Sequence, residues 1–112
     1  MNKKKEIRKK FKDDVFKRDK YTCKICSLKY HQDEAELYLD AHHITDRSEM
    51  PNGGYVPENG ISLCDWFEGC HIKAELYHIT EGKEWTQGMH PDDLYKLIGS
   101  SKDIAYQKSL EL

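Results

Sequence analysis

The chain has 112 residues, of which 34% are charged and 38% are hydrophobic, tyrosine included. Counting the seven glycines in place of the seven tyrosines leaves that share unchanged, below the roughly 45–50% of ordinary domains, so the core must be small. No apolar run approaches the ~20 residues that span a bilayer, and the N-terminus lacks the apolar segment of a signal peptide. These features exclude a membrane protein and favour a reducing, cytoplasmic location.

The formal net charge is −2, but the charge is unevenly distributed along the chain. Residues 1–20 hold ten basic and four acidic side chains, which gives +6, whereas residues 21–112 hold eight basic and sixteen acidic ones, which gives −8. A basic N-terminal segment on an acidic body suits contacts with phosphate groups. A solvated helix face produces the same pattern, so charge alone does not decide the function.

The N-terminal segment is predicted to form a basic amphipathic helix over about residues 5–18. Its apolar side chains recur at i, i+4, i+8 and i+9 with charged residues between them, at Ile7, Phe11, Val15 and Phe16. The segment from Tyr21 to about Tyr30 then contains two closely spaced cysteines and is predicted to fold as a tight turn around a metal ion.

Two short strands are predicted next, joined by a long loop. Residues 37–44 alternate Leu37, Leu39 and Ala41 on one face, which indicates the first strand. The following residues, 50–60, contain three glycines and two prolines and indicate a loop. The second strand is expected at 61–63, where it runs into Cys64.

Helices are predicted for the rest of the chain, at about 70–78, at about 91–98 after the turn residues 88–91, and less clearly from Lys102 onward. No repeat, low-complexity tract or linker marks a domain boundary. The sequence therefore indicates one α+β domain over 1–112, with its motif core at about 21–78 and a helical C-terminal extension at about 88–112.

The four cysteines form two pairs, Cys23-x2-Cys26 and Cys64-x5-Cys70. Each short loop can offer two sulfur ligands about 3.5–4 Å apart, which is the usual layout of a structural, tetrahedral zinc site. The second pair is wider than the common two-residue spacing, but a wider turn can still close on one ion. The alternative is two disulfides, which the lack of a signal peptide and the reducing location that it implies make less favourable.

Histidines supply the second group of candidate ligands. His42 and His43 are adjacent in the first predicted strand, so their side chains should point to opposite faces unless the backbone bends there. His71, Glu75 and His78 stand at i, i+4 and i+7, so they share one helix face. For the isolated histidines, including His31, His78 and His90, a surface or packing role is the expectation.

Several of these segments together resemble the His-Asn-His (HNH) endonuclease motif. The resemblance rests on Asp-Ala-His42-His43-Ile, on Pro-Glu-Asn59-Gly-Ile-Ser-Leu-Cys64, and on Cys70-His71, with an upstream Tyr-Thr-Cys-Lys-Ile-Cys like that of family members with a four-cysteine zinc. It covers about residues 11–75. It implies the ββα-metal module, in which a hairpin with a tied-back loop is followed by a helix that completes a metal site.

The resemblance also implies roles for individual residues. His42 and His71 would bind the catalytic divalent metal, and His43 would be the general base that activates water. The metal would stabilise charge on the transition state and on the departing 3′ oxygen. Asn59 would hold the hairpin loop so that the base is oriented.

Two residues carry open alternatives within this resemblance. Glu75 stands where many family members have a third metal ligand, and it would favour Mg²⁺ or Mn²⁺ over the alternatives Ni²⁺ and Zn²⁺, but it could equally be an exposed helix carboxylate. Arg47 could contact the scissile phosphate or form a loop salt bridge with Asp46 or Glu49. Lys9 and Lys12 of the basic helix are further candidate contacts to DNA.

The sequence thus predicts a metal-dependent endonuclease acting on double-stranded DNA, as a monomer or a homodimer. A zinc-stabilised DNA-binding module without cleavage activity is the alternative, and a protein-interaction domain is a third. By analogy with small stand-alone proteins of this kind, a phage or mobile element would be the source, with the cytoplasm of a bacterium or phage-infected host cell as the location.

Overall fold

The structure is a computed structural model that describes residues 3–112. Its first helix, α1, spans Lys3–Arg18. Phe11, Val15 and Phe16 are buried on its inner face, while its charged residues face outward. The predicted basic amphipathic helix is therefore confirmed, with a start two residues earlier than the apolar pattern indicated.

Two antiparallel strands form the sheet, β1 (Leu39–His43) and β2 (Gly60–Cys64). Their register pairs Leu39 with Cys64 and His43 with Gly60. Every residue of β2 is buried, because β2 lies beneath helices as well as beside β1. The long connection between the strands consists of short 3-10 turns and holds the predicted glycines and prolines.

The first strand is shorter than predicted. Residues Ala35–Tyr38 form a helical turn, α2, and the side chain of Leu37 is exposed there. The reason lies in the partner strand, because β2 ends at Cys64 and the chain then turns away toward Cys70. Residues before Leu39 therefore have no strand to pair with, and no sheet is present there to bury the apolar side chains of the alternating pattern.

Gly60 explains how closely α1 approaches the sheet. A Cβ atom at this position would lie 2.6 Å from Cγ2 of Val15 and 2.7 Å from the ring of Phe11. Glycine therefore permits the close packing of helix against strand, which places the Phe11 ring beside the end of β1.

The helix predicted at about 70–78 is present but interrupted. It consists of α3 (Cys70–Ala74) and α4 (Leu76–Ile79), which meet at Glu75. Backbone hydrogen bonds from Glu75 to His71 and from Ile79 to Glu75 keep the two segments nearly continuous. The interruption leaves His71 and Glu75 on one side of the helix, as their spacing predicts.

The two predicted C-terminal helices are confirmed as α5 (Pro91–Leu97) and α6 (Lys102–Leu110). The side chain of His90 caps α5 by accepting a hydrogen bond from the backbone N–H of Asp92, which gives this histidine the structural role expected of it. Helix α6 packs under the loop between the strands, where Asn52 donates to the backbone oxygen of Ser109.

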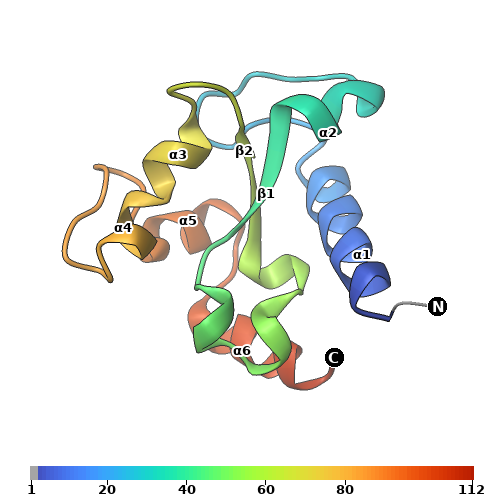
Figure 1. The fold of residues 1–112 in the computed structure, drawn as a ribbon, viewed down its shortest axis with the longest axis vertical. Helices are drawn as coiled ribbons and strands as arrows, with labels where there is room; N and C mark the ends of the chain where they lie inside the picture. The colour runs from blue at the N-terminus through green and yellow to red at the C-terminus, as the bar shows by residue number, and fades with distance from the viewer. Residues whose placement is uncertain (1–2) are drawn as a thin grey trace.

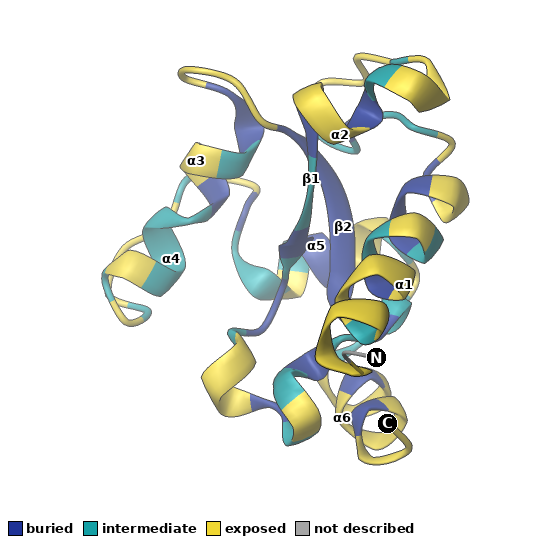
Figure 2. Ribbon diagram, turned by 45° about the vertical axis from the view of Figure 1, so that its right-hand side comes forward, coloured by how far each residue is buried: buried dark blue, intermediate teal, exposed yellow. Residues whose placement is uncertain are grey.

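The sheet lies at the centre of the molecule, with α1 along one side and α3 and α4 on the other (Figure 1). Buried residues lie on the inner faces of α1 and α3 and along the whole of β2 (Figure 2). Within residues 3–112, no helix is both long enough and apolar enough to cross a membrane.

Candidate functional site

The four cysteines converge from two distant segments. Cys23 and Cys26 lie in the turn after α1, and Cys64 and Cys70 lie at the end of β2 and the start of α3. Their Sγ atoms all lie within 4.8 Å of one another, with 3.7 Å between those of Cys26 and Cys64. Tetrahedral zinc, with Zn–S bonds of about 2.3 Å, holds its sulfurs about 3.8 Å apart. The cluster is compatible with structural zinc, and the structure has all four thiols free, with no disulfide among them.

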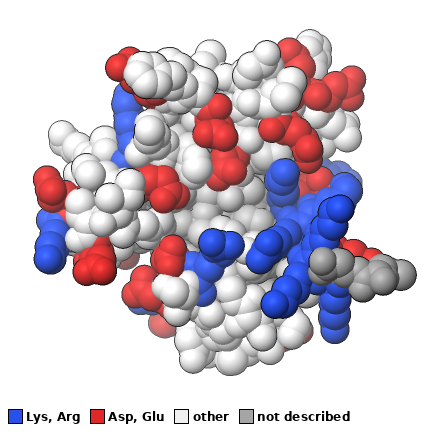
Figure 3. All heavy atoms as spheres, in the orientation of Figure 1, with Lys and Arg blue, Asp and Glu red and all other residues white. Residues whose placement is uncertain are grey.

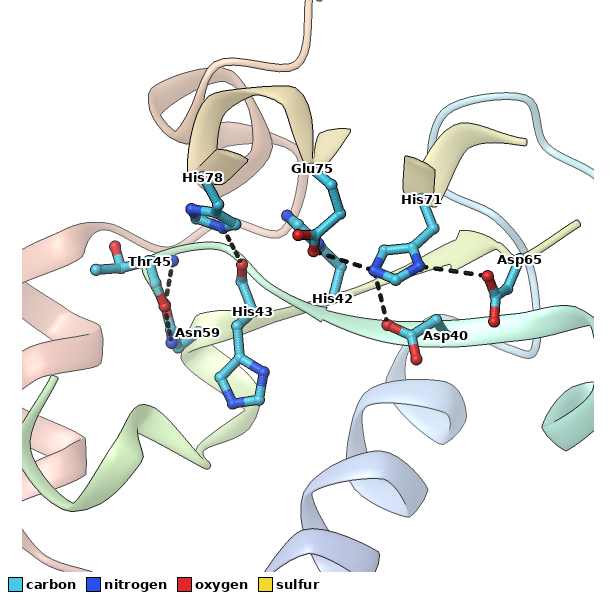
Figure 4. A network of polar contacts seen from close by, with 9 residues as sticks. All are labelled: Asp40, His42, His43, Thr45, Asn59, Asp65, His71, Glu75 and His78. Atoms are coloured by element: carbon cyan, nitrogen blue, oxygen red, sulfur yellow. Dashed lines mark hydrogen bonds and ion pairs between the residues drawn. The ribbon is translucent and has the colours of Figure 1, made fainter. Parts of the chain in front are cut away.

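A second cluster joins His42 on β1 with His71 and Glu75 on the α3–α4 segment. Oε1 of Glu75 lies 3.1 Å from Nδ1 of His42 and 3.2 Å from Nε2 of His71 (Figure 4). His42 is 2% exposed, and its Nδ1 atom is buried without a hydrogen-bond partner among the described residues, since the contact with Glu75 lacks hydrogen-bond geometry. Two imidazole nitrogens and one carboxylate oxygen thus converge on a single point, which is a donor set suited to a divalent metal ion.

Electrostatics within this cluster keep its members in different charge states. Burial lowers the pKa of His42, so this imidazole is neutral at pH 7. Burial also acts to lower the pKa of His71, but its hydrogen bond with Glu75 and the negative charge of Asp40 outweigh burial and raise the pKa to about 9. The nearby imidazoles of His42 and His71 lower the pKa of Glu75, which stays ionised.

Two further carboxylates approach His71 from the sheet side. Oδ2 of Asp40, on β1, lies 3.2 Å from Nε2 of His71, and Oδ1 of Asp65 lies 3.4 Å from Nδ1 (Figure 4). Asp40, Asp65 and His71 therefore form another trio whose ligand atoms lie within 4.8 Å of one another. His71 belongs to both trios.

His43 points away from this cluster, toward α1 (Figure 4). Its ring stacks on Phe11, with centroids 4.6 Å apart, and meets the edge of Tyr55 at 4.7 Å. Burial, helped by the neighbouring imidazole of His42 and by the positive charge of Arg47, lowers the pKa of His43 to about 4. At pH 7 the imidazole is therefore neutral and able to accept a proton.

A hollow of about 220 Å³ opens beside His43. Three basic side chains line this hollow, Arg8 and Lys12 from α1 and Arg47 from the loop between the strands. The acidic residue that lines it is Asp40. Nη1 of Arg47 donates to the hydroxyl of Tyr55 at 2.9 Å, and the structure gives Arg47 no salt bridge with any described acidic residue. The loop salt bridge considered for this arginine is therefore absent from residues 3–112.

The two candidate lysines on α1 lie in different surroundings. Lys12 lines the hollow beside His43 and lies 3.4 Å from Glu36. Lys9 lies outside that hollow and pairs with Asp13 at 2.7 Å. On the surface shown in Figure 3, many Lys and Arg side chains gather along the α1 side. Acidic side chains lie over the upper part and the opposite part of this face.

Asn59 is fully buried and ties the loop after β1 back onto itself. Its Oδ1 atom accepts hydrogen bonds from the backbone N–H of Thr45 at 3.0 Å and from the hydroxyl of Tyr95 at 2.7 Å. Its Nδ2 atom donates to the backbone oxygens of Thr45 at 3.0 Å and of Gly54 at 3.2 Å. All four contacts restrain the segment that begins directly after His43.

His78 completes the surroundings of the histidine pair. Its Nε2 atom hydrogen-bonds to the backbone oxygen of His43 at 2.9 Å, and its ring lies 5.3 Å from that of His42. It is not a member of the His42 cluster, and its hydrogen bond supports the backbone at the end of β1. His31, the other isolated histidine, is exposed.

Sequence reasoning missed three residues of this region: Asp40, Arg8 and Tyr95. Asp40 could have been found, because residues two apart in a strand share a face and Asp40 is two before His42. Arg8, one turn before the buried Phe11, lies over the ring of Tyr55. No local signal identifies Tyr95, because it reaches Asn59 only through the folding of α5.

Comparison of the chain with models of protein families, with curated proteins and with solved structures found no match in any of the three.

Replacement of Asn59 by alanine is expected to destabilise the protein by about 3 kcal/mol, because several buried backbone and hydroxyl groups would lose their partner at about 1–3 kcal/mol each. Tyr95→Phe removes only one hydroxyl and should cost about 1 kcal/mol. Urea unfolding followed by circular dichroism measures both values. An Asn59→Ala variant no less stable than Tyr95→Phe would contradict the central position of Asn59 in this network.

Proposed function

We propose that this protein is a divalent-metal-dependent DNA endonuclease of the HNH type, which hydrolyses phosphodiester bonds. The observation that carries the proposal is the convergence of His42, His71 and Glu75, in which a buried imidazole nitrogen without a hydrogen-bond partner in residues 3–112 faces a second imidazole and a carboxylate. Such a donor set binds Mg²⁺ or Mn²⁺ through the carboxylate, and Ni²⁺ or Zn²⁺ through the imidazoles.

The order of elements supports the same proposal. An antiparallel hairpin is followed by a helical segment that returns His71 and Glu75 to the face of β1 that holds His42. Asn59 fastens the hairpin loop, which is the part that the HNH resemblance assigns to it. The four-cysteine cluster fixes the start of α3 and so sets the position of His71, one residue after Cys70.

His43 would act as the general base in this proposal. Its neutral imidazole takes a proton from the water molecule that attacks phosphorus, while Arg47 and Lys12 of the adjoining hollow attract the phosphate. A bound divalent metal would supply stabilisation of the charge that develops on the phosphate and on the 3′ oxygen. His42, His71 and Glu75 would hold it.

A substrate must reach both sides of β1 for this chemistry, because His42 and His43 point to opposite faces. Within residues 3–112 the sheet has only two strands, so β1 pairs with β2 along one edge and has no strand on the other. Asp40 contacts His71 and also lines the hollow beside His43. A DNA backbone laid along this free edge of β1 would therefore meet the metal ligands and the base together.

A DNA-binding module without cleavage activity is the second candidate. One observation favours it. The Nε2 atom of His43 is buried between Phe11 and Tyr55 on the far side of β1 from the metal ligands, and no described residue hydrogen-bonds to it. In that case the basic side of α1 would bind the backbone and the zinc cluster would serve stability alone.

Plasmid cleavage separates the two candidates. Zinc-loaded protein is incubated with supercoiled plasmid and Mg²⁺, Mn²⁺ or Ni²⁺, with matched reactions that contain EDTA. We expect metal-dependent nicked circles, with linear product appearing directly only if two copies act together on the two strands. DNA binding in a gel-shift assay without cleavage by any of the three ions would favour the binding module and contradict the endonuclease.

Binding of the divalent metal is expected to release about one proton per ion, because His71 is protonated below its pKa of about 9 and must lose that proton to bind metal. The apparent affinity should therefore rise about tenfold per pH unit between pH 6 and 8 and level off near pH 9. Calorimetric titration of the zinc-loaded protein with Mn²⁺ in two buffers of different ionisation enthalpy measures the released proton. An affinity independent of pH would exclude His71 as a ligand.

A further inference from the structure

Four residues that line the hollow beside β1 all contact one side chain, that of Tyr55. The ring of Tyr55 lies 4.7 Å from the ring of His43 and 5.6 Å from that of Phe11. The guanidinium carbon of Arg8 lies over the same ring, 5.6 Å from its centre. The hydroxyl of Tyr55 accepts a hydrogen bond from Nη1 of Arg47 at 2.9 Å. Tyr55 therefore connects the proposed base with two of the basic residues of the hollow.

The loop before Tyr55 is shaped to place this ring. Gly53 has a φ of 80°, in the left-handed region, and a Cβ atom there would lie 2.8 Å from Cε2 of Tyr55. Glycine satisfies both constraints at once. Asn59 anchors the next residue, Gly54, by donating to its backbone oxygen at 3.2 Å. The backbone on the N-terminal side of Tyr55 is thus held in place, so its ring has a defined position in the hollow.

The tyrosine hydroxyl holds Arg47 without neutralising its charge. Within residues 3–112 Arg47 forms no salt bridge, and the carboxylate of Asp46, the residue before it, accepts hydrogen bonds from Ser48 instead. A guanidinium has five N–H donors, so the bond with Tyr55 leaves four for an anion. Arg8 likewise has no salt bridge among the described residues. The charges of both arginines are therefore available to a phosphate in the hollow.

The geometry points to Tyr55 as a positioning residue, which holds Arg47 in the hollow so that its guanidinium meets the phosphate beside His43, an inference that rests on the proposed function. Tyr55 itself need not touch the substrate. A free arginine side chain loses rotamer freedom when it binds a partner, and a side chain that is already held loses less. The hydrogen bond to Arg47 therefore strengthens binding of the DNA backbone at the place where the base acts.

The hydroxyl distinguishes this role from simple packing of the ring. Tyr55→Phe keeps the ring beside His43 and removes only the hydrogen bond with Arg47. Tyr106→Phe removes the hydroxyl of an exposed tyrosine on α6 and is the matched control. Because neither substitution changes the charge of the protein, a change in DNA affinity reports the placement of charges that are already present.

The test is a double-mutant cycle between Tyr55 and Arg47, measured as the affinity of the zinc-loaded protein for a short DNA duplex. Fluorescence anisotropy without added Mg²⁺ or Mn²⁺ gives this affinity, and circular dichroism confirms that each variant is folded. We expect Tyr55→Phe to weaken binding about threefold to tenfold in the wild-type background and to have no effect in an Arg47→Ala background. Tyr106→Phe should bind like the wild type. An equal loss in both backgrounds, or no loss in either, would overturn the assignment of Tyr55.

Plasmid nicking by the same proteins separates failure of this inference from failure of the proposed function. With Mn²⁺, kcat/KM for nicking should fall about threefold to tenfold in Tyr55→Phe, again only when Arg47 is present. Nicking by the wild type without this coupling would show that only the role of Tyr55 is wrong. Coupled DNA binding without nicking by the wild type would support the role of Tyr55 in backbone binding and would contradict the endonuclease.

Discussion

His43→Ala is expected to reduce metal-dependent plasmid nicking by about 100- to 10,000-fold, which is the range that a general base contributes. Affinity for Mn²⁺ should stay close to that of the wild type, because the ring of His43 points away from His42, His71 and Glu75. Initial rates of nicking at saturating Mn²⁺, together with gel-shift binding to the same plasmid, measure the two effects separately.

The surroundings of His43 allow a sharper version of this experiment. Its ring lies between Phe11 and Tyr55, so the alanine variant leaves a space bounded by two aromatic rings. Imidazole added to the reaction should restore part of the nicking by His43→Ala and none to His42→Ala, which lacks a metal ligand. His31→Ala, at an exposed position, is the control for histidine loss. Unchanged nicking by His43→Ala would contradict the assigned base.

The four-cysteine cluster is compatible with a structural zinc ion, and loss of such an ion is expected to unfold the protein. Structural zinc contributes about 10–16 kcal/mol of apparent binding free energy, whereas a whole domain is stable by about 5–15 kcal/mol. Cys23 and Cys64 are buried in the core, so an empty cluster would also leave crowded thiols there. Cys23→Ser should give protein without zinc and without a cooperative thermal transition.

Chelation provides the reversible form of this test. A strong zinc chelator should remove one zinc ion per chain, measured by a colorimetric dye, together with the helical circular dichroism signal. Addition of Zn²⁺ should restore the signal, and addition of Mg²⁺ should not, because thiolates bind zinc far better than magnesium. A folded chain without zinc would show that the remaining hydrophobic core is sufficient.

Local patterns in the sequence were enough to predict most of the elements. The spacing of Phe11 and Val15 marks the buried face of α1 because one helix face contacts one surface. The spacing within the two cysteine pairs predicts that the four cysteines lie together, because metal coordination is short-ranged and specific for the ligand. The HNH resemblance implies a site that contains His42 and His71, with Glu75 as a possible third member, and the three side chains converge in the structure.

What the sequence did not reveal depends on contacts between distant residues. The start of β1 is set by the length of β2, and Leu37 itself carries no sign of where its partner strand ends. Tyr95 meets Asn59 across 36 positions, a contact that arises from the packing of α5. The direction of the His43 ring follows from α1, since Gly60 lets Phe11 approach closely enough to stack on it.

The close packing of Phe11 has a consequence for how this protein can change during evolution. The side chain of Phe11 belongs to the buried face of α1 and also lines the hollow beside His43. Selection for stability and selection for the proposed activity would therefore act on the same residue. The opposite face of α1 carries exposed lysines such as Lys9 and Lys10, whose replacement disturbs no core contact. The charge of the outer face can therefore change during evolution while the inner face stays fixed.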